Sequence, residues 1–137
     1  MKIRLDPGAR IPTRAHDTDA GYDLYAREDM TIPFGGSAVF DTGVHMQIPK
    51  GMAGLIVSKS GLNTVFNLTS TGLIDSGYTG SIKVKLYNHG ATPYKVCAGD
   101  KISQIVIIPI FTPLLEIVDE FEQTERGNNG FGSSGRQ

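Results

Sequence analysis

Glycine and proline interrupt this chain so often that long helices are excluded. Seventeen glycines and seven prolines are spread over 137 residues, and no apolar period of 3.6 residues continues between them for more than about two turns. Turn sequences recur instead at a spacing of about ten residues, which is typical of an antiparallel sandwich or barrel. They are residues 33–36, 42–43, 49–51, 88–90 and 98–100. Helix is therefore expected to be a minor component.

Between these turns, apolar residues follow the period of a strand. In residues 81–87 every second residue is apolar, as a half-buried strand requires: Ile82, Val84 and Leu86. Residues 44–48 repeat the alternation. Two short apolar runs suit strands buried on both faces, residues 54–57 and 105–108. The pattern predicts an all-β fold, a jelly-roll-like barrel.

Composition narrows the class of protein and its partners. A chain of 137 residues with 39% hydrophobic and 20% charged residues can form one domain that buries roughly two-thirds of its unfolded surface. It contains no stretch of 18 apolar residues, so no membrane span is expected. Residues 1–10 lack the apolar run of a secretory signal and Cys97 has no partner cysteine, which favours a cytoplasmic location. The net charge of −1 gives no field for a nucleic-acid polymer, so a small-molecule partner is expected.

Several familiar motifs fail on their details. Four carboxylates have the spacing of a calcium loop, but Tyr22 stands where its sharp turn needs glycine; they are Asp17, Asp19, Asp23 and Glu28. The three histidines and Cys97 show no spacing of zinc ligands. Ser58 occupies a glycine position both of the Walker loop and of the nucleophile elbow, and the barrel is expected to offer no strand-to-helix turn. A P-loop ATPase is therefore excluded, and Ser60 is a poor nucleophile for a serine hydrolase.

Two short segments could bind phosphate or carry catalysis. The hydroxyl of Ser60 and the backbone N–H groups beside Gly61 could meet a phosphate oxygen, with Lys59 adding a cation, although many such turns are only turns. Asp75 follows an apolar pair and precedes the tight turn Ser76-Gly77. Such a carboxylate could deprotonate a water as a general base or merely cap the turn.

The last segment, residues 124–137, differs in composition from the rest. Four glycines alternate with Asn and Ser around Arg126 and Phe131. By composition this is a flexible end, and a frayed terminus is one interpretation. The other is an arm that orders over a nucleotide, because Arg126 supplies a phosphate fork and Phe131 an aromatic plate. We therefore divide the chain into a barrel domain, 1–123, and a C-terminal arm, 124–137.

Five blocks, in one order along the chain, resemble the five motifs of the trimeric dUTPase family. The blocks are AGYDLYA (20–26), VSKSGL (57–62), GLIDSGYTGSI (72–82), AGDKISQ (98–104) and RGNNGFGSSG (126–135). The third and fifth are the most distinctive, and together the five cover nearly the whole chain. The resemblance implies a homotrimeric dUTPase that hydrolyses dUTP to dUMP and pyrophosphate with Mg²⁺, by attack of water on the α-phosphorus.

The resemblance also implies a role for individual residues. Asp75 aligns and deprotonates the attacking water, and Asp23 holds Mg²⁺ through waters. Tyr78 packs beneath the sugar and excludes a 2′-hydroxyl, while the hairpin around Thr69 to Gly72 reads uracil. The remaining substrate-binding residues contact the phosphates or cover the base: Lys59, Ser60, Gly61, Gln104, Arg126, Phe131, Gly132, Ser133 and Ser134.

The chain departs from the family pattern at two places. Lys59 stands where the family usually has arginine, which replaces a planar fork by a point charge. Asn128-Asn129 stand where an acidic residue or glycine is more usual. Two other functions stay open: a dCTP deaminase, which shares the fold, and a regulatory protein that binds an unknown protein partner under nucleotide control.

Overall fold

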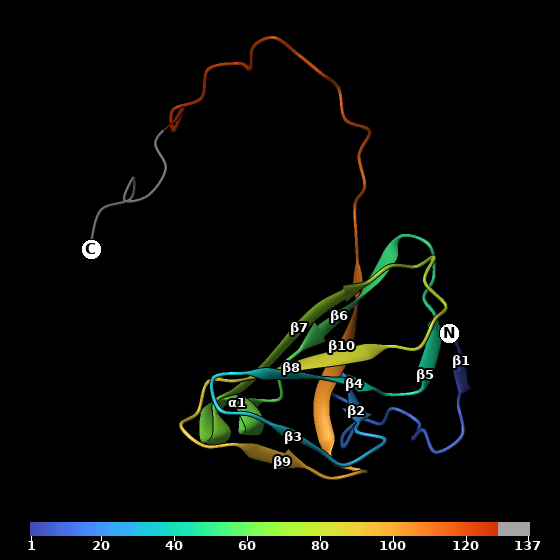
Figure 1. Cartoon of the computed structure of the whole chain (residues 1–137). Coiled ribbons are helices and arrows are strands. Elements are labelled where there is room, and N and C mark those ends of the chain that lie inside the picture. The colour runs from blue at the N-terminus through green and yellow to red at the C-terminus, as the bar shows by residue number, and fades with distance from the viewer. Residues whose placement is uncertain (129–137) are drawn as a thin grey trace.

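The alternation of apolar residues produces short antiparallel strands that curl into a half-barrel, seen in the computed structural model, which describes residues 1–128 (Figure 1). The strands are β1 (Lys2–Leu5), β2 (Tyr22–Tyr25), β3 (Met30–Ile32), β4 (Ser37–Asp41), β5 (Val44–Gln47), β6 (Met52–Val57), β7 (Leu68–Ile74), β8 (Lys83–Asn88), β9 (Tyr94–Val96) and β10 (Lys101–Pro109). One short helix, α1 (Ser60–Phe66), connects β6 to β7. The predicted all-β class with little helix is confirmed.

The main sheet has six strands in the order β2-β10-β6-β7-β8-β4. All of its neighbouring strands are antiparallel, and two smaller sheets, β1-β5 and β3-β9, complete the curled surface. In β8 the buried residues are Val84, Leu86 and Asn88, so the predicted alternation is confirmed, although the strand begins at Lys83. The core also includes Phe40, Leu24 and other aliphatic side chains from both ends of the main sheet.

The two strands expected to be buried on both faces are buried on one. Ile56 and Ile105 point into the core, but Leu55 of β6 and Val106 of β10 stay partly exposed on the outer face. Val106 pairs with Leu55, and Leu55 pairs with Leu73, which is 60% exposed. These three residues form an apolar row across β10, β6 and β7, which we call the outer row. Within residues 1–128 all three side chains remain at least partly exposed.

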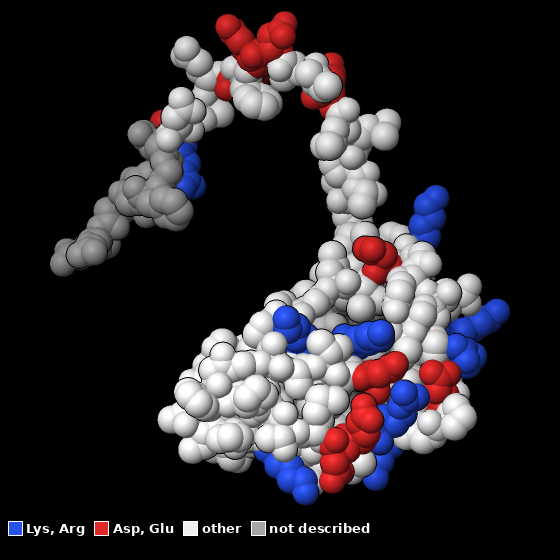
Figure 2. Space-filling view, in the orientation of Figure 1, with Lys and Arg blue, Asp and Glu red and all other residues white. Residues whose placement is uncertain are grey.

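After β10 the chain leaves the barrel. Residues 110–128 contain no helix or strand and extend away from the sheet (Figure 1). Five of their apolar side chains are almost fully exposed: Phe111, Leu114, Leu115, Ile117 and Phe121. Acidic side chains also gather on this extension, at a distance from the barrel (Figure 2). Among residues 1–128, no helix is long and apolar enough to cross a membrane.

Candidate functional site

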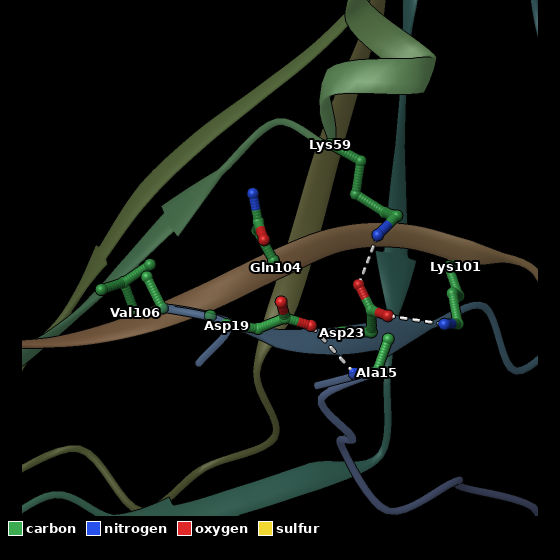
Figure 3. Close-up of a pocket in the computed structure, with 9 residues that line it drawn as sticks. Ala15, Asp19, Asp23, Lys59, Lys101, Gln104 and Val106 are labelled. Carbon is green, nitrogen blue, oxygen red and sulfur yellow. Dashed lines mark hydrogen bonds and ion pairs between the residues drawn. The ribbon is translucent and has the colours of Figure 1, made fainter. Parts of the chain in front are cut away.

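A polar pocket of about 320 Å³ opens where the first, second and fourth blocks meet. Asp23 from β2, Gln104 from β10 and Lys59 just before α1 lie around it, together with Asp19 and Lys101 (Figure 3). The antiparallel pairing of β2 with β10 sets Gln104 opposite Asp23, and the pairing of β10 with β6 sets it opposite Val57. Sheet register therefore brings together three segments that are far apart in sequence.

Asp23 is the charged centre of this pocket. Its side chain is 9% exposed and lies between two ammonium groups, with Lys59 Nζ 2.5 Å from Oδ1 and Lys101 Nζ 2.7 Å from Oδ2 (Figure 3). Burial opposes ionisation of Asp23, but the hydrogen bonds from Lys101 and Lys59 outweigh it and lower the pKa of Asp23 below its usual value. The hydrogen bond between Asp23 and Lys101 also raises the pKa of Lys101. The pocket therefore carries two cations and one fixed carboxylate.

The second block differs locally from the prediction. Ser60 does not lie in an isolated turn but is the first residue of α1, directly after β6 and Lys59. A strand-to-helix turn, which the barrel was expected to lack, is therefore present, because Lys59 is extended while the seven residues after it are helical. Ser58 still occupies the glycine position of a nucleophile elbow, so this correction does not restore a serine hydrolase. A Cβ atom added at Gly61 would have no neighbouring atom within 4 Å, so the backbone at Gly61 is open to a ligand.

A buried set of hydroxyl groups holds this corner of the sheet. Ser103 donates from Oγ to the carbonyl of Val57 at 2.8 Å and lies 2.7 Å from Ser70 Oγ. The amide of Ser70 donates to Ser58 Oγ at 2.8 Å, and Gln104 Nε2 donates to the Ser58 carbonyl at 3.3 Å. No buried side-chain polar atom in residues 1–128 lacks a hydrogen-bond partner. The end of β6 that precedes Lys59 is therefore firmly placed.

Asp75 does not join this pocket within one chain. It follows β7, whose last residue, Ile74, pairs with Gly54 near the start of β6, whereas Lys59 follows the other end of β6. The extended stretch from Gly54 to Lys59 spans about 16 Å. Figure 1 shows the same separation, with α1 and the β7–β8 loop at opposite ends of the sheet.

The residues expected around the nucleoside also lie outside the pocket. Tyr78 lies in the loop after Asp75, where its amide donates to the Asp75 carbonyl at 3.0 Å and its hydroxyl donates to the Ser81 carbonyl at 2.9 Å. Thr69 and Gly72 belong to β7, and Thr69 Oγ1 lies 2.8 Å from His89 Nε2. The structure thus forms two groups: Asp23, Lys59 and Gln104 at one end of β6, and Asp75 with Tyr78 at the other.

The remaining predicted residues belong to the C-terminal arm. Arg126 is exposed on the extension beyond β10. Four residues lie outside the described part of the chain: Phe131, Gly132, Ser133 and Ser134.

The sequence analysis missed Lys101 as a charged partner of Asp23. Its signal was its place in the fourth block, three residues before Gln104, where only the glutamine was singled out. Asp19 was considered only as part of the rejected calcium loop: its carboxylate accepts hydrogen bonds from the backbone N–H groups of Ala15 and His16 and lines the pocket. No group of three or more His, Cys, Asp or Glu side chains within residues 1–128 could hold a metal ion.

Fold and pocket together define a class: an all-β protein whose cationic pocket suits a phosphorylated ligand. A model of the family described as dUTPase matches residues 8–135. The chain belongs to the dUTPase family.

The sequence is similar to named relatives along nearly its full length. The chain is 46% identical to the deoxyuridine 5′-triphosphate nucleotidohydrolase of Mycobacterium marinum, over 97% of this chain and 92% of that protein. It is 43% identical to the protein of the same name from Yarrowia lipolytica, over 96% of this chain and 85% of that protein.

Solved structures show the same fold. The dUTPase of Staphylococcus bacteriophage 80alpha, solved with dUPNHPP, superposes with a TM-score of 0.91 at 35% identity, over 98% of this chain and 97% of that chain. Phage dUTPases such as that of 80alpha control transfer of virulence genes. A variant of the dUTPase of phage phi11 of S. aureus, described with a structural Mg(II) ion, superposes with a TM-score of 0.82 at 34% identity, over 89% of this chain and 98% of that chain.

Proposed function

We propose that this protein is a dUTP diphosphatase, which hydrolyses dUTP to dUMP and pyrophosphate. The observation that carries the proposal is the dUTPase family match over residues 8–135, which includes all five blocks. The pocket around Asp23 fits the triphosphate, because Lys59 and Lys101 supply positive charge and Gln104 a neutral donor. Neutralising the phosphate oxygens removes the repulsion that slows attack by water.

Asp23 fits Mg²⁺ as a ligand through water. Mg²⁺ is usually held by one or two carboxylates together with substrate phosphates and waters, so a single carboxylate beside a phosphate pocket suffices. In the free protein both oxygens of Asp23 accept from lysines. Incoming phosphates compete for these ammonium groups, which frees the carboxylate to accept from metal-bound water. When bound, Mg²⁺ would neutralise charge on the phosphates and on the pyrophosphate leaving group.

Asp75 is proposed as the general base. It would orient the water that attacks the α-phosphorus and accept its proton. Tyr78, three residues after Asp75 in the same loop, would pack beneath the deoxyribose, and backbone groups around Thr69 to Gly72 would read uracil. Gly72 suits that role, because a Cβ atom there would meet only ordinary contacts of 3.5 Å with Ile56, so packing within the chain does not itself demand glycine.

The separation of the two residue groups supports a homotrimer. Lys59 and Asp75 of one chain lie at opposite ends of β6, too far apart to meet at one triphosphate. A site that contains both therefore needs two copies of the chain, and closed cyclic symmetry supplies one such site for each subunit. The outer row, Val106, Leu55 and Leu73, and the exposed apolar side chains of residues 110–121 give these copies apolar surface to bury. Light scattering should give three times the mass of 14.8 kDa.

Residues 124–137 are proposed to close over the bound nucleotide. Arg126 would pair with the outer phosphates, Ser133 and Ser134 would add hydrogen bonds, and Phe131 would cover the uracil beside Gly132. Closure would exclude bulk water from the reaction. The boundary between barrel and arm at residues 123 and 124 stays a prediction, as does a cytoplasmic location.

The alternatives from the sequence are not favoured. The two relatives compared above are named for action on deoxyuridine triphosphate, which does not favour a dCTP deaminase. A regulatory role would be an addition to hydrolysis, since the family match covers all five blocks.

A direct assay tests the function. Purified protein with Mg²⁺ is given each deoxynucleoside triphosphate and UTP in turn, and pyrophosphate is measured. We expect release from dUTP far above that from the others. Ammonia release from dCTP, or equal rates on all nucleotides, would contradict the proposal.

A further inference from the structure

The loop between β7 and β8 is held in place by side chains outside the proposed chemistry. This loop carries Asp75 and Tyr78 and contains two glycines, so its own backbone restrains it weakly. The carbonyl of Thr79 lies 2.8 Å from Nδ1 of His45, on the neighbouring strand β5. The side chain of His45 is only 11% exposed, so its ring is fixed by packing as well as by hydrogen bonds.

We propose that His45 is a positioning residue for Asp75 and Tyr78, which it holds through the carbonyl of Thr79. The inference rests on the proposed function, since it assigns to these two residues their roles in dUTP hydrolysis.

The contacts of Thr79 explain how its carbonyl sets both functional side chains. Thr79 adjoins Tyr78, whose amide is hydrogen-bonded to the Asp75 carbonyl, so the turn between them moves as a unit. The ring of Tyr78 lies directly on Gly80: a Cβ atom at Gly80 would be 2.5 Å from the Tyr78 hydroxyl oxygen. Displacement of Thr79 and Gly80 therefore displaces the ring that is proposed to meet the sugar.

The next hydrogen bonds that tie the loop to the rest of residues 1–128 lie beyond this point. Ser81 Oγ donates to the carboxylate of Asp41, and the Ile82 amide donates to the Val44 carbonyl at 2.8 Å. These bonds anchor the loop where it enters β8. The hydrogen bond from His45 meets the loop at Thr79, which is nearer in sequence to Asp75 and Tyr78 than Ser81 or Ile82 is.

The charges around His45 make its hold depend on pH. Asp6 Oδ2 lies 3.1 Å from Nε2, and Arg4 Nη2 lies within 2.9 Å of both ring nitrogens; Arg27 lies 3.9 Å from Asp6 and 3.8 Å from Asp41. The hydrogen bond to Asp6 and then that to Thr79 raise the pKa of His45, against the opposing charge of Arg4.

An imidazolium donates to Asp6 and Thr79 together, whereas a neutral ring has one N–H for these two acceptors. Because the folded-state pKa of His45 is raised, the full hold is present below the usual pKa of 6.5 and weakens as pH rises through the folded value.

Two substitutions separate the bond to Thr79 from the rest of the side chain. His45→Asn keeps an N–H donor near the position of Nδ1, whereas His45→Leu removes both donors and keeps an apolar body. Both lose the contact with Asp6 to the same degree. Gln47→Leu is the matched control, because Gln47 is exposed on the same face of β5, two residues away.

Two kinds of measurement are made on the full-length protein. The first is hydrogen exchange of residues 75–82 without ligand. The second is steady-state kinetics at several pH values, which gives kcat for dUTP and the ratio of dUTP to UTP hydrolysis. Thermal unfolding checks that each variant is folded. We expect His45→Leu to speed exchange in this loop and to lower kcat by about tenfold, as a misplaced catalytic group does. His45→Asn and Gln47→Leu should stay within about twofold of wild type, and His45→Asn should lose the pH dependence that His45 contributes.

Each outcome decides one of the two claims. If His45→Leu leaves the exchange and kcat unchanged, or if His45→Asn is as impaired as His45→Leu, the positioning role is overturned. If the wild-type protein does not hydrolyse dUTP, the proposed function fails, while loop exchange still decides whether His45 holds the loop.

Discussion

Mixing two inactive variants tests whether each site is built from two subunits. One variant, Asp75→Asn, keeps the side-chain shape but removes the proposed base. The other, Lys59→Ala with Gln104→Ala, removes a cation and a donor from the pocket around Asp23. The two sets of substitutions lie at opposite ends of β6, separated by about 16 Å of extended chain within one subunit.

The expected recovery follows from this geometry. In a random equal mixture, a site that draws Asp75 and Lys59 from different subunits has each intact in half of the cases, so about one quarter of the sites are complete. If one subunit supplied both, every site would carry a defect and the mixture would be as inactive as its components. The difference is large because Asp75→Asn alone should lower turnover by about 10² or more.

The two variants are co-expressed with different affinity tags, and mixed oligomers are purified through both tags before pyrophosphate release is measured. Selection through both tags removes oligomers that contain only one variant. The fraction of complete sites in the mixed oligomers stays close to the one quarter expected for the random mixture. Mixed oligomers of the two single-tagged wild-type chains set the reference rate. Mixed oligomers that are folded and correctly sized but stay at the background rate would refute the shared site, as would an active monomer.

Four further outcomes are expected. Asp75→Asn should keep nucleotide affinity while turnover falls by about 10²; near-normal turnover would remove its role as base. Tyr78→Ala should raise UTP hydrolysis relative to dUTP, and an unchanged ratio in steady-state kinetics would contradict the steric role. Deleting residues 124–137 should lower turnover at least about tenfold with little change in melting temperature, through lost closure, and a dUTP analogue should protect these residues from protease better than dUMP does. Asp23 stabilises the fold above its unfolded pKa of 3.8, and this contribution is lost as pH falls through its lowered folded pKa; denaturant unfolding at one protein concentration should therefore show a smaller acid loss for Asp23→Asn than for wild type.

The strands could be predicted because their signal is local. Val84 and Leu86 alternate with charged residues, and this period alone fixes which face of β8 is buried. The helix after β6 escaped prediction because seven residues are too short for a 3.6-residue period to stand out. Its first residue, Ser60, reads equally well as part of a turn.

For the site, too, the sequence predicted what is local and not what depends on long-range contacts. Asp23, Lys59 and Gln104 were named from short blocks, but their proximity depends on the register of β2, β10 and β6, which no local pattern encodes. Lys101 was overlooked for the same reason, since its partner Asp23 lies on another strand. Leu55 and Val106 were expected to be buried because a short, continuous apolar run does not tell which of its two faces is covered.

Hydrolysis of dUTP in water enriched with oxygen-18 tests the central claim most directly. If a water aligned by Asp75 attacks the α-phosphorus, mass spectrometry should find one labelled oxygen in dUMP and none in pyrophosphate. Label in pyrophosphate would place the attack on the β-phosphorus, and release of inorganic phosphate without dUMP would place it on the γ-phosphorus. Either result, or the absence of any product from dUTP, would contradict the account.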